Sequence, residues 1–169
     1  MKNISLFSII CFFCVESHGQ GGKKVLNTPP PPINNLIELY KSQSLPKIFN
    51  YLKVNKFELT NKKDKKSRVV FDTYYFRKGD LTLWVSTKQN KYYDLSYYPS
   101  NSNTVIGVIG NLLELKYSLN YSKTNENKEL KSDYNVYNKD GIYVEVDSFY
   151  DKTRMNAYYS ILISNNSNW

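Results

Sequence analysis

Cysteine and histidine are nearly absent from this chain, and their positions restrict its chemistry. The 169 residues contain two cysteines, Cys11 and Cys14, and one histidine, His18. All three lie in an N-terminal segment that we expect to be removed, so the mature chain would hold none of them. Such a chain forms no disulfide and lacks Cys nucleophiles, Ser-His-Asp triads and His or Cys zinc sites. We therefore expect a protein that is not an enzyme and that uses no metal or other cofactor.

Long apolar runs are also missing. The run Ile4–Val15 has twelve residues, whereas a membrane-spanning helix needs about 20. Lys2 precedes this run and the short stretch Ser17-His18-Gly19 follows it, an arrangement typical of a secretory signal over residues 1–19. The alternatives are an uncleaved N-terminal anchor and, with less support, a bacterial lipoprotein. We predict export to the periplasm, the cell surface or the medium, with a mature chain that begins near Gln20 and has no transmembrane helix.

Glycine and proline are few, but several of them gather between residues 20 and 32. Gly21-Gly22 predicts a flexible stretch, and the four prolines Pro29–Pro32 predict a stiff polyproline II segment. We interpret residues 20–32 as a tether. Beyond it we expect a first folded unit over residues 33–100, a second over residues 101–164, and a short tail over residues 165–169.

The two expected units are similar to each other in sequence. An apolar helix, an aromatic strand, a basic turn and an alternating strand recur in the same order in both. Leu52 matches Leu112 sixty residues later, and Leu83 matches Val144 sixty-one residues later. Self-similarity at a nearly fixed spacing is the signature of an internal repeat. We therefore predict a tandem duplication.

Each unit reads as helix followed by strands. Ile33, Leu36, Ile37 and Tyr40 are spaced i, i+3, i+4, i+7, which predicts an amphipathic helix over residues 33–43. Ser44 and Pro46 predict the start of a second helix, so the first unit has two helices. Asn103 or Thr104 is the expected cap of the helix in the second unit.

Four strands follow the helical part of each unit, joined by loops short enough for antiparallel hairpins. The fold class is therefore α+β, built from duplicated α-β4 units in which a helix packs on a four-stranded antiparallel sheet. We expect the core face of the strands to carry Phe57, Leu59, Val69, Phe71, Leu81, Leu83, Val85, Leu95 and Tyr97 in the first unit, and Tyr117, Leu119, Leu130, Val136, Ile142, Val144, Val146, Met155, Tyr159 and Ile161 in the second.

This architecture resembles two known classes at the level of topology. A tandem helix-plus-four-strand repeat in an exported protein resembles the β-lactamase-inhibitor-protein and PepSY-like class, and a single helix against a sheet resembles cystatin-like units. The resemblance covers residues 33–163 and rests on no shared motif. It implies an open sheet face that holds a partner protein, and it implies no particular partner residue.

Aromatic residues are abundant, with 16 tyrosines in the chain. Strand alternation places some of them on the face away from the helices. Tyrosine and tryptophan are enriched in binding hot spots, although tyrosine is also simply a good strand residue. The candidate binding face consists of Trp84, Tyr74, Phe76, Tyr92, Tyr98, Tyr143 and Tyr158.

The net charge is +8, and it is unchanged when Lys2 and Glu16 leave with the signal. A basic exported protein can meet anionic polymers or an acidic partner. The densest cluster is a basic hairpin loop of Lys62, Lys63, Lys65, Lys66 and Arg68. A solvated loop that protects a sheet edge explains this cluster equally well. We expect no nucleic acid partner, because the chain has no recognition motif.

Paired carboxylates are the catalytic option that remains without histidine. Asp72 and Asp133 occupy matching positions in the two units, and we expect both on the face away from the helices. Glycoside hydrolysis needs two carboxyl groups on either side of a substrate. A cross-strand pair with Lys or Arg is the simpler interpretation of each.

We predict an exported, non-enzymatic binding or interaction module that contacts a protein or an envelope polymer through its aromatic sheet face. The alternatives are a carboxylate-only glycan hydrolase and an immunity or structural envelope protein. The two units differ where Trp84 of the first is matched by Glu145 of the second. This asymmetry is where we expect specialised function.

Overall fold

The computed structural model describes residues 28–62, 71–79, 81–88, 91–99 and 101–165. Three helices and eight strands are present in this part of the chain. The helices are α1 (Ile33–Lys41), α2 (Leu45–Val54) and α3 (Ser102–Glu114). The strands are β1 (Glu58–Lys62), β2 (Phe71–Lys78), β3 (Leu81–Lys88), β4 (Lys91–Tyr98), β5 (Ser118–Glu126), β6 (Leu130–Lys139), β7 (Ile142–Asp151) and β8 (Asn156–Ser164).

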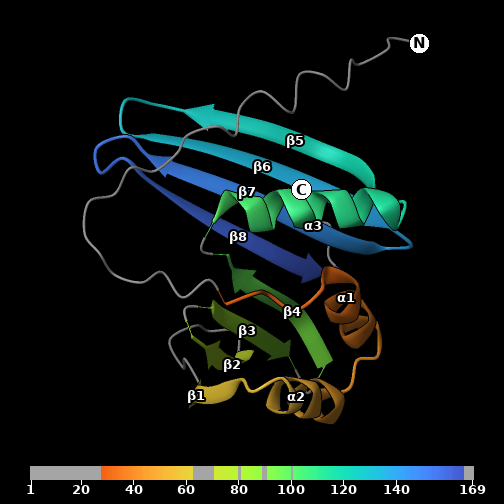
Figure 1. Cartoon of the computed structure of the whole chain (residues 1–169). Helices are drawn as coiled ribbons and strands as arrows, with labels where there is room; N and C mark the ends of the chain where they lie inside the picture. The colour runs from red at the N-terminus through yellow and green to blue at the C-terminus, as the bar shows by residue number, and fades with distance from the viewer. Residues whose placement is uncertain (1–27, 63–70, 80, 89–90, 100, 166–169) are drawn as a thin grey trace.

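All eight strands form one antiparallel sheet (Figure 1), in the order β1-β2-β3-β4-β8-β7-β6-β5. The α+β class and the antiparallel sheet are therefore confirmed. The two groups of four strands join where β4 pairs with β8, with Leu95 opposite Ile163 and Tyr97 opposite Ile161. We call this β4–β8 pairing the seam. It makes the sheet continuous across the whole described chain.

Local sequence explains where the helices begin. Pro46 lies in the first turn of α2, where its missing N–H costs no hydrogen bond. The side chain of Asn101 caps α3 by accepting a hydrogen bond from the backbone N–H of Thr104 at 2.9 Å. The expected cap, Asn103 or Thr104, is therefore wrong by two or three residues, because the helix starts one turn earlier than its apolar stripe suggests. No helix of the described residues is long and apolar enough to cross a membrane.

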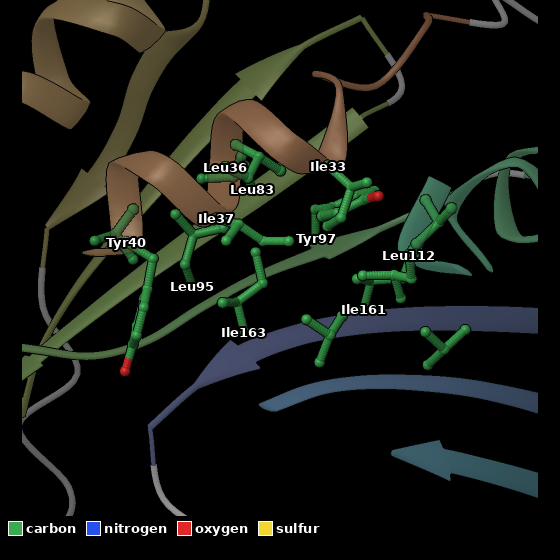
Figure 2. Close-up of a cluster of buried hydrophobic side chains, with 14 of the residues drawn as sticks. Ile33, Leu36, Ile37, Tyr40, Leu83, Leu95, Tyr97, Leu112, Ile161 and Ile163 are labelled. Carbon is green, nitrogen blue, oxygen red and sulfur yellow. The ribbon is translucent and has the colours of Figure 1, made fainter. Parts of the chain in front are cut away.

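The three helices pack on the same face of the sheet, where one apolar core holds them together. The expected stripe of α1, Ile33, Leu36, Ile37 and Tyr40, is fully buried. It lies against the seam and against the strands beside it (Figure 2), among side chains that include Leu83, Leu95, Tyr97, Ile161 and Ile163. Since α1 contacts β4, β8 and α3, it ties the two groups of strands together.

Most of the expected core residues are buried on the helix face, and the exceptions follow a pattern. Leu59 and Leu119 face the helix side, but they lie on the edge strands β1 and β5 and are about half exposed. Met155 is exposed in the turn between β7 and β8. Val69 lies outside the described residues, as does the side chain of Phe71.

The side chains of β6, the second strand of the second group, face the opposite sides of the sheet from those expected. Leu130 and Val136 of β6 pair with Asp151 and Glu145 and lie on the face away from the helices, whereas Tyr137 packs in the core. The expectation for Leu130 and Val136 is therefore wrong. Apolar side chains occur on both faces of this strand, so alternation alone does not define which face is inside.

One core residue leads to a stability prediction. Tyr97 is fully buried, and its hydroxyl has no hydrogen-bond partner among the described groups, while burial raises its pKa. An unpaired buried hydroxyl costs about 1–3 kcal/mol. Tyr97→Phe should therefore raise the free energy of unfolding by about 1 kcal/mol in urea denaturation. Leu83→Ala, as a control in the same core, should lower it by about 2–5 kcal/mol. A loss of stability in Tyr97→Phe would show that the hydroxyl is hydrogen-bonded.

Candidate binding face

The sheet face away from α1, α2 and α3 is the candidate site, and we call it the open face. Cross-strand partners share a face, so the register defines its members. A central row runs from Tyr75 through Trp84 and Ser96 of one group of strands to Leu162 and Glu145 of the other. Trp84 and Glu145, which the sequence comparison matched to each other, thus occupy corresponding places in the same row.

The first group of strands contributes three aromatic rings that contact one another. The Trp84 ring lies 5.0 Å from that of Tyr75 and 4.9 Å from that of Tyr98, measured between centroids. The indole Nε1 of Trp84 is buried and has no hydrogen-bond partner among the described groups. Edge-to-face and tilted ring pairs of this kind fix each other's orientation. Trp84 is therefore a half-buried, oriented ring and not a free surface side chain.

The second group of strands carries a matching set of rings. Tyr134 of β6 and Phe149 of β7 meet edge to face, with centroids 5.6 Å apart. Tyr158 of β8 is the cross-strand partner of Phe149 and is exposed. Tyr143 lies at the other end of β7 on the same face. The open face therefore has aromatic side chains on both sides of the seam.

The candidate residues are not all found on this face. Trp84, Tyr98, Tyr143 and Tyr158 lie on it, as alternation predicts. Tyr74 and Phe76 do not, so their predicted orientation is wrong. They pair with Val85 and Leu83 on the helix side, where their rings contact Phe49 of α2 at 5.0 and 5.1 Å.

The predicted orientation of Tyr74 and Phe76 failed because β2, like β6, has apolar residues on both faces, so alternation alone does not define which face is inside. In β2, Tyr74, Tyr75 and Phe76 are consecutive, so any choice of phase places an aromatic residue outside. Tyr75 is the one on the open face, and sequence reasoning missed it. The side chain of Tyr92 and the basic loop of Lys62, Lys63, Lys65, Lys66 and Arg68 lie outside the residues whose side chains are described.

Two carboxyl groups stand next to each other in the middle of this face. Glu145 and Asp147 of β7 are only 6% and 7% exposed. Ser160 Oγ of β8 donates a hydrogen bond to Asp147 Oδ2 at 2.9 Å. Burial, the charge of Asp147 and a hydrogen bond to Asp147 raise the pKa of Glu145 to about 8.

This pair shares a proton at neutral pH. Burial also raises the pKa of Asp147, although less so because Ser160 and Glu145 donate hydrogen bonds to it. Asp147 Oδ1 has no hydrogen-bond partner among the described groups, and a proton on Glu145 would supply a donor for it. Two carboxyls in contact cannot both ionise easily, so the pair carries one negative charge.

A third carboxyl group lies across the seam. Burial raises the pKa of Asp94 in β4, although a hydrogen bond from Ser86 opposes the shift. The pKa of Tyr98 is raised by burial and then by the negative charges of Asp94 and Asp147. Tyr98 therefore lies within the electric field of carboxyl groups from both groups of strands. Sequence reasoning singled out Glu145 only as the counterpart of Trp84 and missed Asp94 and Asp147, whose one visible signal was an acidic residue among the apolar and aromatic residues of a strand.

The carboxyl pair expected from the sequence does not lie here. Asp72 pairs with Thr87 and Asp133 with Ser148, positions that alternate onto the helix side, so their predicted face is wrong. Asp133 accepts a hydrogen bond from Thr124 Oγ1 at 2.6 Å. Asp72 and Asp133 belong to different groups of strands. Within the described residues, no group of three or more His, Cys, Asp or Glu residues is arranged to hold a metal ion.

Basic side chains gather elsewhere, around a hollow of about 260 Å³ at the β1–β2 edge of the sheet. Its lining residues are Lys56, Glu58, Thr60, Arg77, Lys78 and Gly79. The Arg77 guanidinium is engaged there, since its Nε donates a hydrogen bond to the Gly79 carbonyl at 3.0 Å. Three cations thus lie together at this edge, whereas carboxyl groups occupy the centre of the open face.

Comparisons with known proteins give no identity. No protein-family model, no curated protein and no solved structure matches this chain.

The carboxyl pair predicts a pH dependence of stability. The pKa of Glu145 is about 8 in the folded protein against 4.5 for the free side chain. The folded state therefore holds a proton that the unfolded state loses between these values, so stability falls as pH rises from about 4.5 to 8. Glu145→Gln should unfold with a free energy on the order of 1–2 kcal/mol higher than wild type at pH 8, with little difference at pH 4.

The control for this experiment is Glu114→Gln, at an exposed position of α3. It should leave the pH profile of urea denaturation unchanged. A wild-type profile as flat as that of Glu145→Gln would show that Glu145 is ionised in the folded protein at neutral pH.

Proposed function

We propose that this protein is an exported, non-enzymatic binding module that contacts a protein or an envelope polymer through the open face. The observation that carries the proposal is a sheet face with oriented aromatic rings on both sides of the seam, which none of the three described helices covers. Rings held by a sheet lose little conformational freedom when they bind. Their burial supplies the affinity, as it does in binding hot spots.

Export is part of the proposal and is supported by the sequence of residues 1–19 and by the tether-like composition of residues 20–32. The described end of this segment meets the folded part, since Pro31 is buried. A signal peptidase would produce a mature chain that starts near Gln20.

Export has a direct test in the source organism. The protein should be found outside the cytoplasm with a mass that corresponds to loss of about the first 19 residues. Replacement of Phe12 by Asp, which interrupts the apolar run, should retain the full-length chain in the cell. A full-length chain in the cytoplasm of the unaltered strain would contradict export.

We also propose that the chain arose by tandem duplication of an α-β4 unit. Similar details at the end of α2 and α3 support it. Lys56 and Lys116 both have φ of 62°, and the N–H groups of Phe57 and Tyr117 each donate to a carbonyl five residues earlier at 2.9 Å.

The strands that follow these helix ends also agree. The register shifts between Leu59 and Asn61 in β1 and between Leu119 and Tyr121 in β5, sixty residues apart. Hairpin shape and hydrophobicity alone do not require two bulges at matching places. The resemblance to the β-lactamase-inhibitor-protein and PepSY-like class, or to cystatin-like units, is a hypothesis from the sequence that would favour a protein as the partner, and no solved structure matches this chain.

A carboxylate-only hydrolase is the second candidate, because Glu145 keeps a proton near neutral pH beside Asp147. The geometry favours it less. Glycosidases hold their two carboxyl groups about 5 Å apart or more, with substrate between them, whereas Glu145 and Asp147 are hydrogen-bonded to each other. An immunity protein would use the open face in the same way as the proposed module, with a toxin as its partner.

The binding proposal is tested by paired surface variants. Tyr158 on the open face and Ile106 on the outer side of α3 are each 47% exposed. The partner is first captured from the extracellular fraction of the source organism, purified and titrated against each variant. Tyr158→Ser should raise the dissociation constant about tenfold or more, as expected at a hot spot. Ile106→Ser should not change it.

The reverse result, with binding lost in Ile106→Ser and kept in Tyr158→Ser, would place the binding surface on the helices. Trp84→Ala is less informative, since Trp84 also packs against Tyr75 and Tyr98. Its truncation should lower stability as well as affinity.

A further inference from the structure

The charge on the open face differs from that of the whole chain. Carboxyl groups on this face belong to Glu58, Asp94, Glu145, Asp147 and Asp151. Its described cations are Arg77 of β2 and Lys123 of β5, which lie on strands away from the centre, and Arg154, which forms an ion pair with Asp151 at the end of β7 (Nε to Oδ2, 3.7 Å). A chain of net charge +8 therefore presents a negative centre on its aromatic face.

We propose that the open face binds a basic protein segment and that an arginine side chain of this partner sits at Glu145 and Asp147. This inference rests on the proposed function and names the partner class of the same site. It favours a protein over an anionic polymer as the partner, because the carboxyl groups of this face repel polyanions.

The surroundings of Asp147 suit a guanidinium group. Tyr134 is its cross-strand partner in β6, and Ser160 is its partner in β8. The ring of Tyr134 is held edge to face by Phe149. Tyr98 lies close enough across the seam for the negative charge of Asp147 to contribute to its raised pKa. A guanidinium donates two parallel hydrogen bonds to carboxylates and stacks on aromatic faces.

A neutral polar ligand fits the site less well than a cation does. Glu145 and Asp147 are both more than nine-tenths buried, and their shared proton is what makes this burial tolerable. An arriving cation can take the place of that proton, so that the pair stays compensated while both carboxyl groups ionise. A sugar hydroxyl supplies no charge and would leave the proton where it is.

This exchange couples binding to pH. Glu145 has a pKa of about 8 in the free protein, and a bound guanidinium lowers it. A proton is therefore released on binding at neutral pH, and affinity increases as pH rises toward 8. The other titratable groups that face the pair are Tyr98, Asp94, Tyr134, Tyr143 and Lys123. Burial raises the pKa of Asp94 as well, so the Glu145→Gln variant is needed to assign the pH dependence to Glu145.

The test uses the full chain and a capped tetra-arginine peptide as the probe, titrated by calorimetry at pH 6 and pH 8. We expect binding that becomes several times tighter at pH 8. A capped tetra-glutamate peptide should not bind at the open face. Because the chain is positive overall, general charge attraction would favour the glutamate peptide, so the opposite preference identifies a local acidic site.

Two substitutions locate the site. Asp147→Asn should weaken tetra-arginine binding at least tenfold, whereas Asp133→Asn, which removes a carboxylate from the other side of the sheet, should not. Glu145→Gln should abolish the pH dependence, since it removes the group that releases the proton. If Asp147→Asn does not fold, as judged by circular dichroism, the pH profile of Glu145→Gln decides the matter.

Equal affinity of wild type and Asp147→Asn for the arginine peptide, or the same pH dependence in Glu145→Gln, would overturn the inference. The proposed function fails separately. If Tyr158→Ser loses the native partner while Asp147→Asn keeps it and the arginine peptide does not bind, the open face is a binding surface for a partner of different chemistry. If neither substitution affects the native partner, both proposals fail.

Discussion

The pairing of β4 with β8 is the interaction on which the rest of this structure depends. Four residue pairs, from Asp94–Ser164 to Tyr97–Ile161, join two groups of strands that would each have an unpaired edge without it. The stripe of α1 covers this seam with fully buried side chains. Backbone pairing and apolar burial thus act at the same place, so neither group of strands has a complete core of its own.

The seam also decides what the open face can be. Asp147 of β7 and Ser160 of β8 are partners within one hairpin, whereas Tyr98 of β4 comes within the field of Asp147 only because the sheet is continuous. Trp84 of the first group and Glu145 of the second are separated in sequence by about sixty residues, yet they lie in one row of the sheet. With Trp84 in the first group of strands and Glu145 at the corresponding place in the second, the open face has an aromatic side and an acidic side.

Periodicity predicted much of the fold and less of the site, for physical reasons visible in particular residues. The stripe Ile33, Leu36, Ile37 and Tyr40 and the core positions Leu83 and Val144 were predictable, since their neighbours in sequence are polar or less apolar. The predicted sheet face was wrong for Tyr74, Phe76 and Val136, because they lie in strands with apolar residues on both faces. The shared proton of Glu145 and Asp147 depends on burial that only the assembled sheet provides. Continuity of the sheet was not predictable either, because pairing between β4 and β8 is non-local.

The carboxyl pair is the feature that the fold itself does not require. Its position in β7 faces away from the core, where a threonine or valine would suit the strand at least as well. Burying a carboxyl group that must keep a proton costs stability at neutral pH, and no cation of the described residues forms an ion pair with Glu145 or Asp147 to offset that cost. Residues that break a local rule without a structural gain are expected at functional sites. Glu145 and Asp147 are therefore stronger candidates for functional residues than the aromatic rings, which also stabilise the sheet by packing against one another.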